Sequence, residues 1–256
     1  MTLHILVDLS HGEEITTFPD ASLEDRDFFV SYVHQNDSLN SITHINRHDL
    51  LVLGNPRPLR KNEMLFRPNE IVALKQFIYQ GGRLLLTSSA QGNRFLSKKS
   101  GSLDVLYKLT GVQSFPYAIL FHTLPQFYTE SKRNIVIKKE NLPPHPIFGE
   151  FTENDRLYTG LSGSTYLIPF EDEILDAEGA KSEVVLRAPE NSIARNLAKK
   201  QNLKVNDVPL ILVRYFGKGI VVSCAFSEFL KKSEYGGYNS LSGSKLFRGI
   251  INFLFG

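Results

Sequence analysis

The polar residues best placed to do chemistry follow directly after short apolar runs. Asp8 ends the first such run, and Ser10 and His11 come next in the chain. Ser88 follows a later apolar run in the same way. A carboxylate, a histidine and a serine are the residue types from which an orienting group, a base and a nucleophile are assembled. The catalytic candidates are therefore Asp8, His11 and Ser88, as the machinery of a hydrolase or transferase.

A wider group of polar residues occupies the same kind of position in other parts of the chain. In an open α/β sheet, ligands bind beyond the carboxyl ends of the parallel strands. Residues from distant segments are expected to converge there, in a cleft that would take a small ligand or a glycan. The ligand-binding candidates are Asp8, Ser10, His11, Asn55, Ser88, Ser89 and Glu228.

A structural role for these residues competes with catalysis. Aspartate and serine at strand ends commonly hydrogen-bond to loop or helix amides. A serine hydrolase also favours a Gly-x-Ser-x-Gly turn, and neither Ser88 nor Ser89 has a glycine two residues before it. We therefore expect no catalytic residue, and keep the hydrolase or transferase as the alternative.

Metal binding is the other chemistry that these residue types allow. Asp8, His11, Glu13 and Glu14 are all possible ligands. A metal site needs three or four convergent ligands, and neighbouring residues on an irregular loop rarely supply them alone. We expect no metal ion and no other cofactor. The chain has one cysteine, which excludes a disulfide framework and any multi-cysteine metal site.

Composition excludes several classes of partner. The 256 residues include 29 basic and 27 acidic side chains, a net charge of +2. This lacks the strong excess of basic residues that is typical of nucleic-acid-binding domains. No run of about 18 apolar residues predicts a membrane span. The N-terminus lacks a basic segment and a cleavage site, so we expect no signal peptide. These features together favour a soluble, cytoplasmic protein.

The elements that must position the candidate residues are predicted from short apolar runs and one amphipathic segment. Apolar runs of this length are typical of buried parallel strands, and the order strand, helix, Gly-Gly, strand predicts a right-handed βαβ unit. In the helix, Leu74 and Phe77 should face the sheet, Asn69 should be the N-cap, and Gly81-Gly82 should end the helix. The strands are predicted at 3–8, 49–54 and 83–87, and the helix at 69–80.

The rest of the chain predicts further elements around this unit. Apolar residues at helical spacing predict helices at 103–112 and 242–255. The segment 23–35 also predicts a helix, although the spacing of its apolar residues is imperfect. Alternating aromatic and β-branched residues predict a β-rich segment over 115–170. A Gly-Lys-Gly turn predicts a hairpin of 210–213 with 220–224. The polar stretch 189–207 is expected to be an exposed insertion or a short helix.

The predicted fold is α/β, with a mostly parallel, flavodoxin-like or amidotransferase-like sheet and helices on both faces. A β-rich extension is expected at about 115–188. The whole chain, 1–256, is expected to form a single domain.

The ordered set of motifs resembles a known superfamily. The segments 51–54, 69–78 and 81–86 resemble the central βαβ unit of class I glutamine-amidotransferase-like folds. The segment 217–224, followed by a polar loop and an apolar helix, resembles the GIFT branch, as does the turn 145–147. That branch includes a core subunit of the intraflagellar-transport B complex, an oligosaccharyltransferase subunit, and gliding-motility or ABC-transporter-associated proteins of bacteria.

The chain departs from the amidotransferases at the catalytic positions. Where those enzymes carry a nucleophilic cysteine, this chain has Ser88, Ser89 and Ala90. The catalytic His-Pro-Glu has no match, because His145-Pro146 is followed by Ile147. We therefore expect no glutamine amidotransferase activity. The resemblance implies a pseudoenzyme: a non-catalytic protein-binding or assembly module, a scaffold that holds one or more protein partners whose identity the sequence leaves open.

Overall fold

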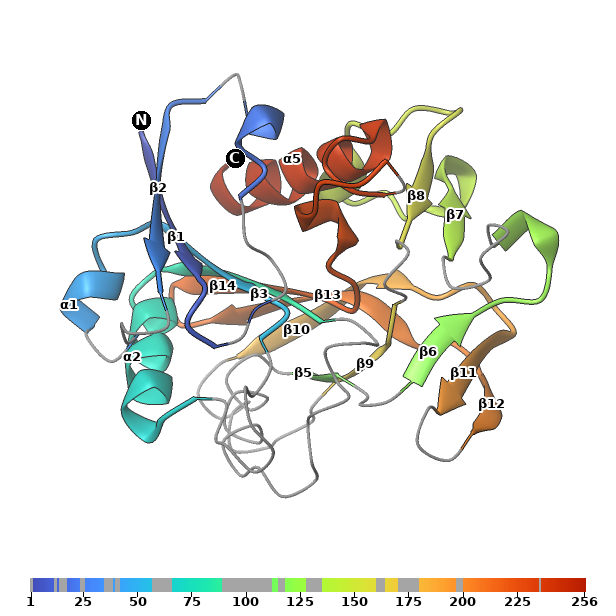
Figure 1. Cartoon of the computed structure of the whole chain (residues 1–256), viewed down its shortest axis with the longest axis horizontal. Helices are drawn as coiled ribbons and strands as arrows, with labels where there is room; N and C mark the ends of the chain where they lie inside the picture. Colours follow the sequence, from blue (N-terminus) through green and yellow to red (C-terminus); the bar gives the residue numbers. More distant parts are fainter. Residues whose placement is uncertain are drawn as a thin grey trace.

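The computed structural model describes residues 2–11, 13, 18–23, 26–34, 39, 42–56, 66–88, 112–114, 118–127, 135–159, 164–169, 180–196, 200–234 and 236–256. A seven-stranded sheet lies at the centre of this part of the chain, in the order β10-β13-β14-β4-β3-β1-β2 (Figure 1). Within the described residues, no helix is long and apolar enough to cross a membrane.

The central sheet is mostly parallel, as the sequence predicts. Strands β2, β1, β3, β4 and β14 pair in parallel, and β13 is antiparallel to both β14 and β10. The strands are β1 (Leu3–Asp8), β2 (Phe28–Val33), β3 (Leu50–Gly54), β4 (Arg83–Thr87), β10 (Lys181–Arg187), β13 (Pro209–Phe216) and β14 (Gly219–Cys224).

Smaller sheets and short helices surround the central sheet, mainly in the segment predicted to be β-rich. The small sheets are β12-β11-β6, β5-β9 and β7-β8. Their strands are β5 (Val112–Ser114), β6 (Ala118–Phe121), β7 (Val136–Lys138), β8 (Arg156–Tyr158), β9 (Leu167–Pro169), β11 (Ser192–Asn196) and β12 (Gln201–Val205). The helices are α1 (Ile42–Ile45), α2 (Pro68–Tyr79) and α5 (Leu241–Phe255), with 3-10 turns η1 (Asp20–Leu23), η3 (Pro125–Phe127), η4 (Lys139–Asn141), η5 (Pro146–Phe148) and η6 (Glu228–Leu230).

Helices cover both faces of the central sheet, with α5 on one side and α2 on the other (Figure 1). Side chains of a strand point alternately to the two faces, and here both faces are apolar. This is why each central strand is a continuous hydrophobic run. The side chains packed with α5 include Ile5, Val7, Leu50, Val52, Leu85 and Val222. Those packed with α2 include Leu6, Leu51, Leu53, Leu84, Leu86 and Val221.

Helix α2 is fixed between the sheet and the turn that follows it. Leu74 and Phe77 are 0% and 2% exposed, which confirms the predicted apolar face. Gly81 has a φ of 116°, a backbone conformation that glycine adopts freely, and it ends the helix as predicted. A Cβ on Gly82 would lie 2.4 Å from the Phe77 ring, so the ring packs directly on the glycine backbone.

Helix α5 packs as closely on the opposite face. A Cβ on Gly249 would lie 2.0 Å from the carbonyl oxygen of Ile147, in the His-Pro turn η5. The closing helix therefore needs a glycine at this crossing, where its backbone meets that of η5.

Three predictions of local structure are wrong. Residues 28–33 form strand β2, and not a helix over 23–35, because they pair in parallel along the whole of β1. The N-cap of α2 is Arg67, with Pro68 in the first turn, and not Asn69. For 189–207 the short helix is the wrong alternative, because the segment contains the hairpin β11-β12, which pairs with β6 and whose second strand is largely exposed. The helix predicted at 103–112 lies outside the described residues, except for Val112, which begins β5.

Candidate functional site

The carboxyl ends of β1, β3, β4 and β14 lie along one edge of the central sheet. In the register of the sheet, Asp8 is opposite Leu53, and Gly54 is opposite Thr87. The candidate residues Asp8, Asn55 and Ser88 therefore follow one another along this edge, each at the end of its own strand.

Asp8, Ser10 and His11 form a hydrogen-bonded group at the end of β1. The Asp8 side chain is fully buried, and its Oδ1 accepts hydrogen bonds from the Ser10 amide at 3.0 Å and the Ser10 hydroxyl at 2.6 Å. Its Oδ2 lies 2.5 Å from Nδ1 of His11. The loop after β1 is thus folded back on the aspartate that ends the strand.

Two residues at the start of α2, Phe66 just before it and Glu70 in its first turn, also contact His11. Nε2 of His11 lies 3.3 Å from Oε2 of Glu70, a buried residue in the first turn of α2. The same Glu70 oxygen accepts the backbone N–H of Arg67 at 2.7 Å. The His11 ring stacks on Phe66, with ring centroids 4.2 Å apart. Residues separated by almost sixty positions in the chain therefore hold one imidazole in place.

A third carboxylate reaches the same place from the loop itself. Oε2 of Glu13 accepts the backbone N–H of His11 at 2.8 Å, and Oε1 of Glu13 lies 4.0 Å from Nδ1 of His11. The Glu13 side chain is 0% exposed, and that of His11 is 9% exposed. Asp8, His11 and Glu13 each offer a ligand atom, and these atoms all lie within 4.8 Å of one another.

The three groups shift one another's protonation. Burial opposes the charged form of His11, but hydrogen bonds to Asp8 and Glu70 outweigh it and raise the pKa of His11 to about 10. Burial and the neighbouring Asp8 charge raise the pKa of Glu13 to about 9. Burial also opposes ionisation of Asp8, yet the hydrogen bond and charge of His11 bring the pKa of Asp8 below its usual value. At neutral pH the favoured state is an Asp8–imidazolium pair beside a protonated Glu13.

The remaining candidates make other contacts. The Ser88 amide and hydroxyl both donate to the carbonyl oxygen of Cys224, at 2.9 and 3.2 Å. Asn55 is 1% exposed, in a left-handed conformation with a φ of 61°. Glu228 begins η6 and forms an ion pair with Lys231 at 3.5 Å. Ser89 and Glu14 lie outside the described residues.

The predicted approach of His11 to the Ser88 turn is absent among the described contacts. Strand β3 lies between β1 and β4. Two strand spacings separate the strand ends by roughly 10 Å. Both ring nitrogens of His11 also have carboxylate neighbours, Asp8 at one and Glu70 at the other. Ser10 Oγ lies 2.9 Å from Nδ1 of His11, but Asp8 Oδ2 faces this same nitrogen. Catalytic triads place the nucleophile on one nitrogen and the carboxylate on the other, so the contacts of Asp8, Ser10 and His11 do not have the arrangement of a triad.

Two of the residues around His11 were not recognised from the sequence. In the sequence, Glu70 indicates only an acidic residue that suits a helix N-terminus, and no pattern marks Phe66. The spacing of Arg67 and Glu70 is that of a helix N-cap and a carboxylate that bonds back to it. That pattern identifies the cap, but it does not reveal that the same carboxylate contacts a histidine from another loop.

Comparison with known proteins identifies the fold. No protein-family model matches the chain, and no curated protein matches it. Among solved structures, the N-terminal domain of mmIFT52 superposes with a TM-score of 0.68 at 13% identity, over 98% of this chain and 96% of that one. The chain therefore shares the α/β fold of this domain.

Two bacterial proteins share this fold. A putative ThuA-like protein from Bacteroides uniformis has a TM-score of 0.59 at 12% identity, over 99% of this chain and 91% of that one. A protein from Salmonella typhimurium described as cytoplasmic, STM3548, has a TM-score of 0.51 at 15% identity, over 98% of both chains. At these identities the likeness concerns the fold alone.

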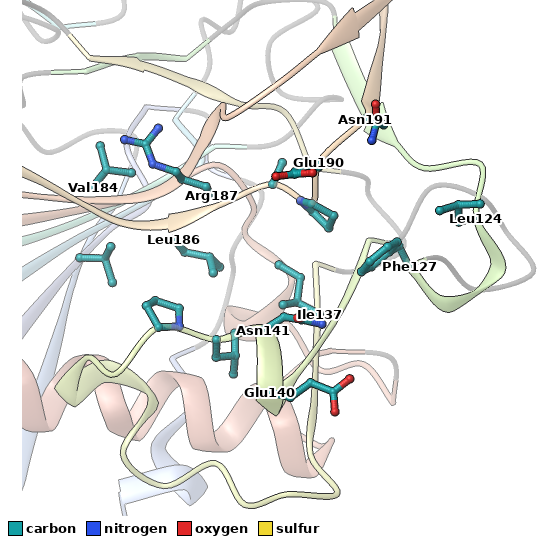
Figure 2. A pocket seen from close by; sticks show the side chains of 15 residues that line it. Leu124, Phe127, Ile137, Glu140, Asn141, Val184, Leu186, Arg187, Glu190 and Asn191 are labelled. Carbon is teal, nitrogen blue, oxygen red and sulfur yellow. The ribbon is translucent and has the colours of Figure 1, made fainter.

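A cavity of about 760 Å³ lies beside β10, the strand at the far end of the central sheet from β1 and β2 (Figure 2). One wall is the segment 184–191, which includes the end of β10. The opposite wall consists of residues from β7, η3 and η4, with the adjoining loops. The apolar lining includes Leu124, Phe127, Ile137, Leu142, Val184 and Leu186.

Proposed function

We propose that the chain is a non-catalytic protein-binding or assembly module, which holds an extended segment of a partner protein in the cavity beside β10. The observation that carries this proposal is that the cavity lies beside β10, the strand at one edge of the central sheet. β10 is the last strand of that sheet, and it pairs with β13 alone among the described strands. An edge strand presents unpaired backbone groups, and adding a strand to such an edge is a common mode of peptide recognition.

The side chains around β10 favour a protein segment as the occupant. The register with β13 shifts between Val184 and Leu186, and Val185 and Leu186 are consecutively buried. Such a bulge redirects side chains from the regular alternation. Leu124, across the cavity, is 47% exposed, which leaves an apolar surface for a partner side chain.

The charges at the cavity indicate which partner segment would fit. Glu140 and Glu190 line the cavity and are exposed (Figure 2). Arg187 also lines it, but its guanidinium forms an ion pair with Asp207 at 3.1 Å. The two glutamates favour a segment with apolar side chains flanked by lysine or arginine.

The fold supports the same proposal. The chain has the fold of the mmIFT52 N-terminal domain, the Ser88 hydroxyl bonds to Cys224 and not to His11, and the resemblance to the GIFT branch implies assembly rather than catalysis. We further propose that it acts in the cytoplasm, because its single cysteine is buried in β14 and forms no disulfide.

The proposal is tested by site-specific photocrosslinking in the source cell. A photoreactive amino acid is placed at Leu124 in the cavity and, as a matched control, at Val72, which is 56% exposed on the outer face of α2. A discrete protein cross-linked from position 124 and not from position 72 is expected. Equal products from both positions would contradict the proposal.

The identified partner is then purified and its affinity measured. Leu124→Asp and Glu190→Lys should each weaken binding by about 10-fold or more, because they alter an apolar contact and a rim charge of the cavity. Glu153→Lys, on an exposed loop outside the cavity, is the control. If the cavity variants bind as tightly as the native protein, the partner binds elsewhere and the proposed site is wrong.

A further inference from the structure

We propose that Asp8, His11 and Glu13 form a binding site for one divalent transition-metal ion, with Zn²⁺ the best match. Their ligand atoms lie within 4.8 Å of one another at the end of β1. One imidazole and two carboxylates are a donor set that zinc accepts in proteins. This inference is independent of the cavity beside β10 and of the partner proposed for it.

The orientation of His11 is the first support. Metal-bound histidines usually donate the N–H of their second ring nitrogen to a carboxylate or carbonyl, which fixes the ring and its tautomer. Glu70 lies 3.3 Å from Nε2 of His11 and provides such an acceptor. With the proton on Nε2, the lone pair of Nδ1 points to the side where Asp8 and Glu13 lie.

The second support is a buried oxygen to which no described group donates a hydrogen bond. The Glu13 side chain is 0% exposed, and its Oε1 accepts no hydrogen bond from a described donor; only the proton that Glu13 shares with Asp8 lies beside it. Its other oxygen is held by the His11 amide, which directs Oε1 toward the ring at 4.0 Å from Nδ1. A buried carboxylate oxygen that accepts no hydrogen bond is costly. A cation between Asp8, His11 and Glu13 would satisfy it.

The charges and the coordination number are also consistent with such an ion. The two carboxylates balance a charge of +2, and neutral His11 adds none. Ser10 Oγ, 2.9 Å from Nδ1 of His11, is a fourth ligand within reach for tetrahedral zinc. Binding would displace the proton between Asp8 and His11 together with that of Glu13, so the affinity should rise with pH.

The ion would join the loop after β1 to the start of α2. The loop supplies the ligands, and α2 supplies Glu70 as the group that orients His11. The low exposure of the ligands favours a structural ion over a catalytic one, which keeps an open position for substrate. The sequence alone predicted no metal, because neighbouring loop residues rarely converge. Here the Glu13 side chain points back toward His11 and Asp8, so the three ligand atoms lie close together.

The test uses the full chain, freed of metal with a chelator and then titrated with Zn²⁺. One equivalent should bind, and the unfolding midpoint should rise with zinc concentration. Glu13→Gln should weaken zinc binding by about 100-fold or more, and Glu70→Gln by about 10-fold. Glu153→Gln, the same change at an exposed carboxylate outside both proposed sites, should leave the affinity unchanged.

Two readouts keep the outcome decisive. Glu13→Gln has the shape of the protonated glutamate, so it is expected to fold, and circular dichroism checks that it does. In the native protein, the ¹⁵N resonance of Nδ1 of His11 should move on zinc addition, which requires no variant. Absence of stoichiometric binding, an unmoved Nδ1 resonance, or zinc affinity in Glu13→Gln equal to that of the native protein would overturn the proposal. The cluster would then be a buried hydrogen-bonded group only.

Discussion

The contact between Phe77 and Gly82 offers a sharp test of how α2 is packed on the sheet. Phe77 is 2% exposed, and its ring occupies the space that a Cβ on Gly82 would need, at 2.4 Å. Truncating Phe77 to alanine should cost about 3–5 kcal/mol, the usual range for a buried phenylalanine. For a chain of this size, that lowers the unfolding midpoint by roughly 10 °C.

The second substitution makes the prediction specific to this contact. Gly82→Ala in the native protein inserts a methyl group into the ring and should cost about 1–3 kcal/mol as overpacking. After Phe77→Ala the ring is gone, and Gly82 is not in the left-handed region of backbone conformation. The added methyl group should then be neutral or stabilise by up to about 1 kcal/mol. The two changes should therefore be coupled by about 2 kcal/mol.

Denaturant unfolding of the four proteins of this cycle measures the coupling. Gly81→Ala is the matched control, since its cost comes from a φ of 116° and its Cβ would meet only Lys218 at 3.6 Å. That cost should be the same with and without the Phe77 ring. If Gly82→Ala is equally destabilising in both backgrounds, or if Phe77→Ala changes the free energy of unfolding by less than about 1 kcal/mol, the assigned face of α2 is wrong.

Further predictions concern the strand-end group, the closing helix and the absent amidotransferase chemistry. In metal-free protein, NMR titration should give His11 a pKa near 10, and Asp8→Asn should lower it; identical curves would show that Asp8 does not act on the ring. His11 and Glu13 keep their protons to about pH 10 and 9 when folded, but release them near their ordinary values of 6.5 and 4.5 when unfolded. The folded state thus binds more protons across this range, so the free energy of unfolding should fall as pH rises from about 5 to 10, and a rise would contradict the assignment. Gly249→Ala should lower the unfolding midpoint by several degrees, because its Cβ would meet a backbone oxygen, and an unchanged midpoint would mean that α5 crosses η5 elsewhere. No steady release of ammonia from glutamine is expected, and release abolished by Ser88→Ala would refute this.

The central sheet and its helices could be predicted because their pattern is local. The continuous apolar runs at 3–8, 49–54 and 83–87 identify strands buried on two faces, and helical spacing identifies α2 and α5. Strand β2 was missed for the opposite reason. It lies at the edge of the sheet, so its exposed and half-buried residues lack the apolar run of an inner strand. Pairing with β1 along its whole length, and not propensity, determines its conformation.

Only the contacts between residues close in sequence could be predicted for the candidate site. Asp8, Ser10 and His11 are neighbours in sequence, and their contact follows from a loop that folds back on its strand. The predicted contact of His11 with Ser88 required the order of the strands along the edge, which no single segment reveals. With β3 between β1 and β4, Ser88 bonds to Cys224 on β14, the strand next to its own.

Glu70 explains why the residues around His11 were beyond prediction from sequence. One of its oxygens accepts the amide of Arg67 and so fixes the start of α2, and the same oxygen faces Nε2 of His11. The helix cap is a local feature, whereas the histidine contact depends on how α2 lies against the end of β1. Since one carboxylate contacts both, we expect a change in the loop after β1 to affect the start of the helix, and the reverse. Whatever occupies the space between Asp8, His11 and Glu13, a proton or a cation, therefore acts on α2 as well as on the loop.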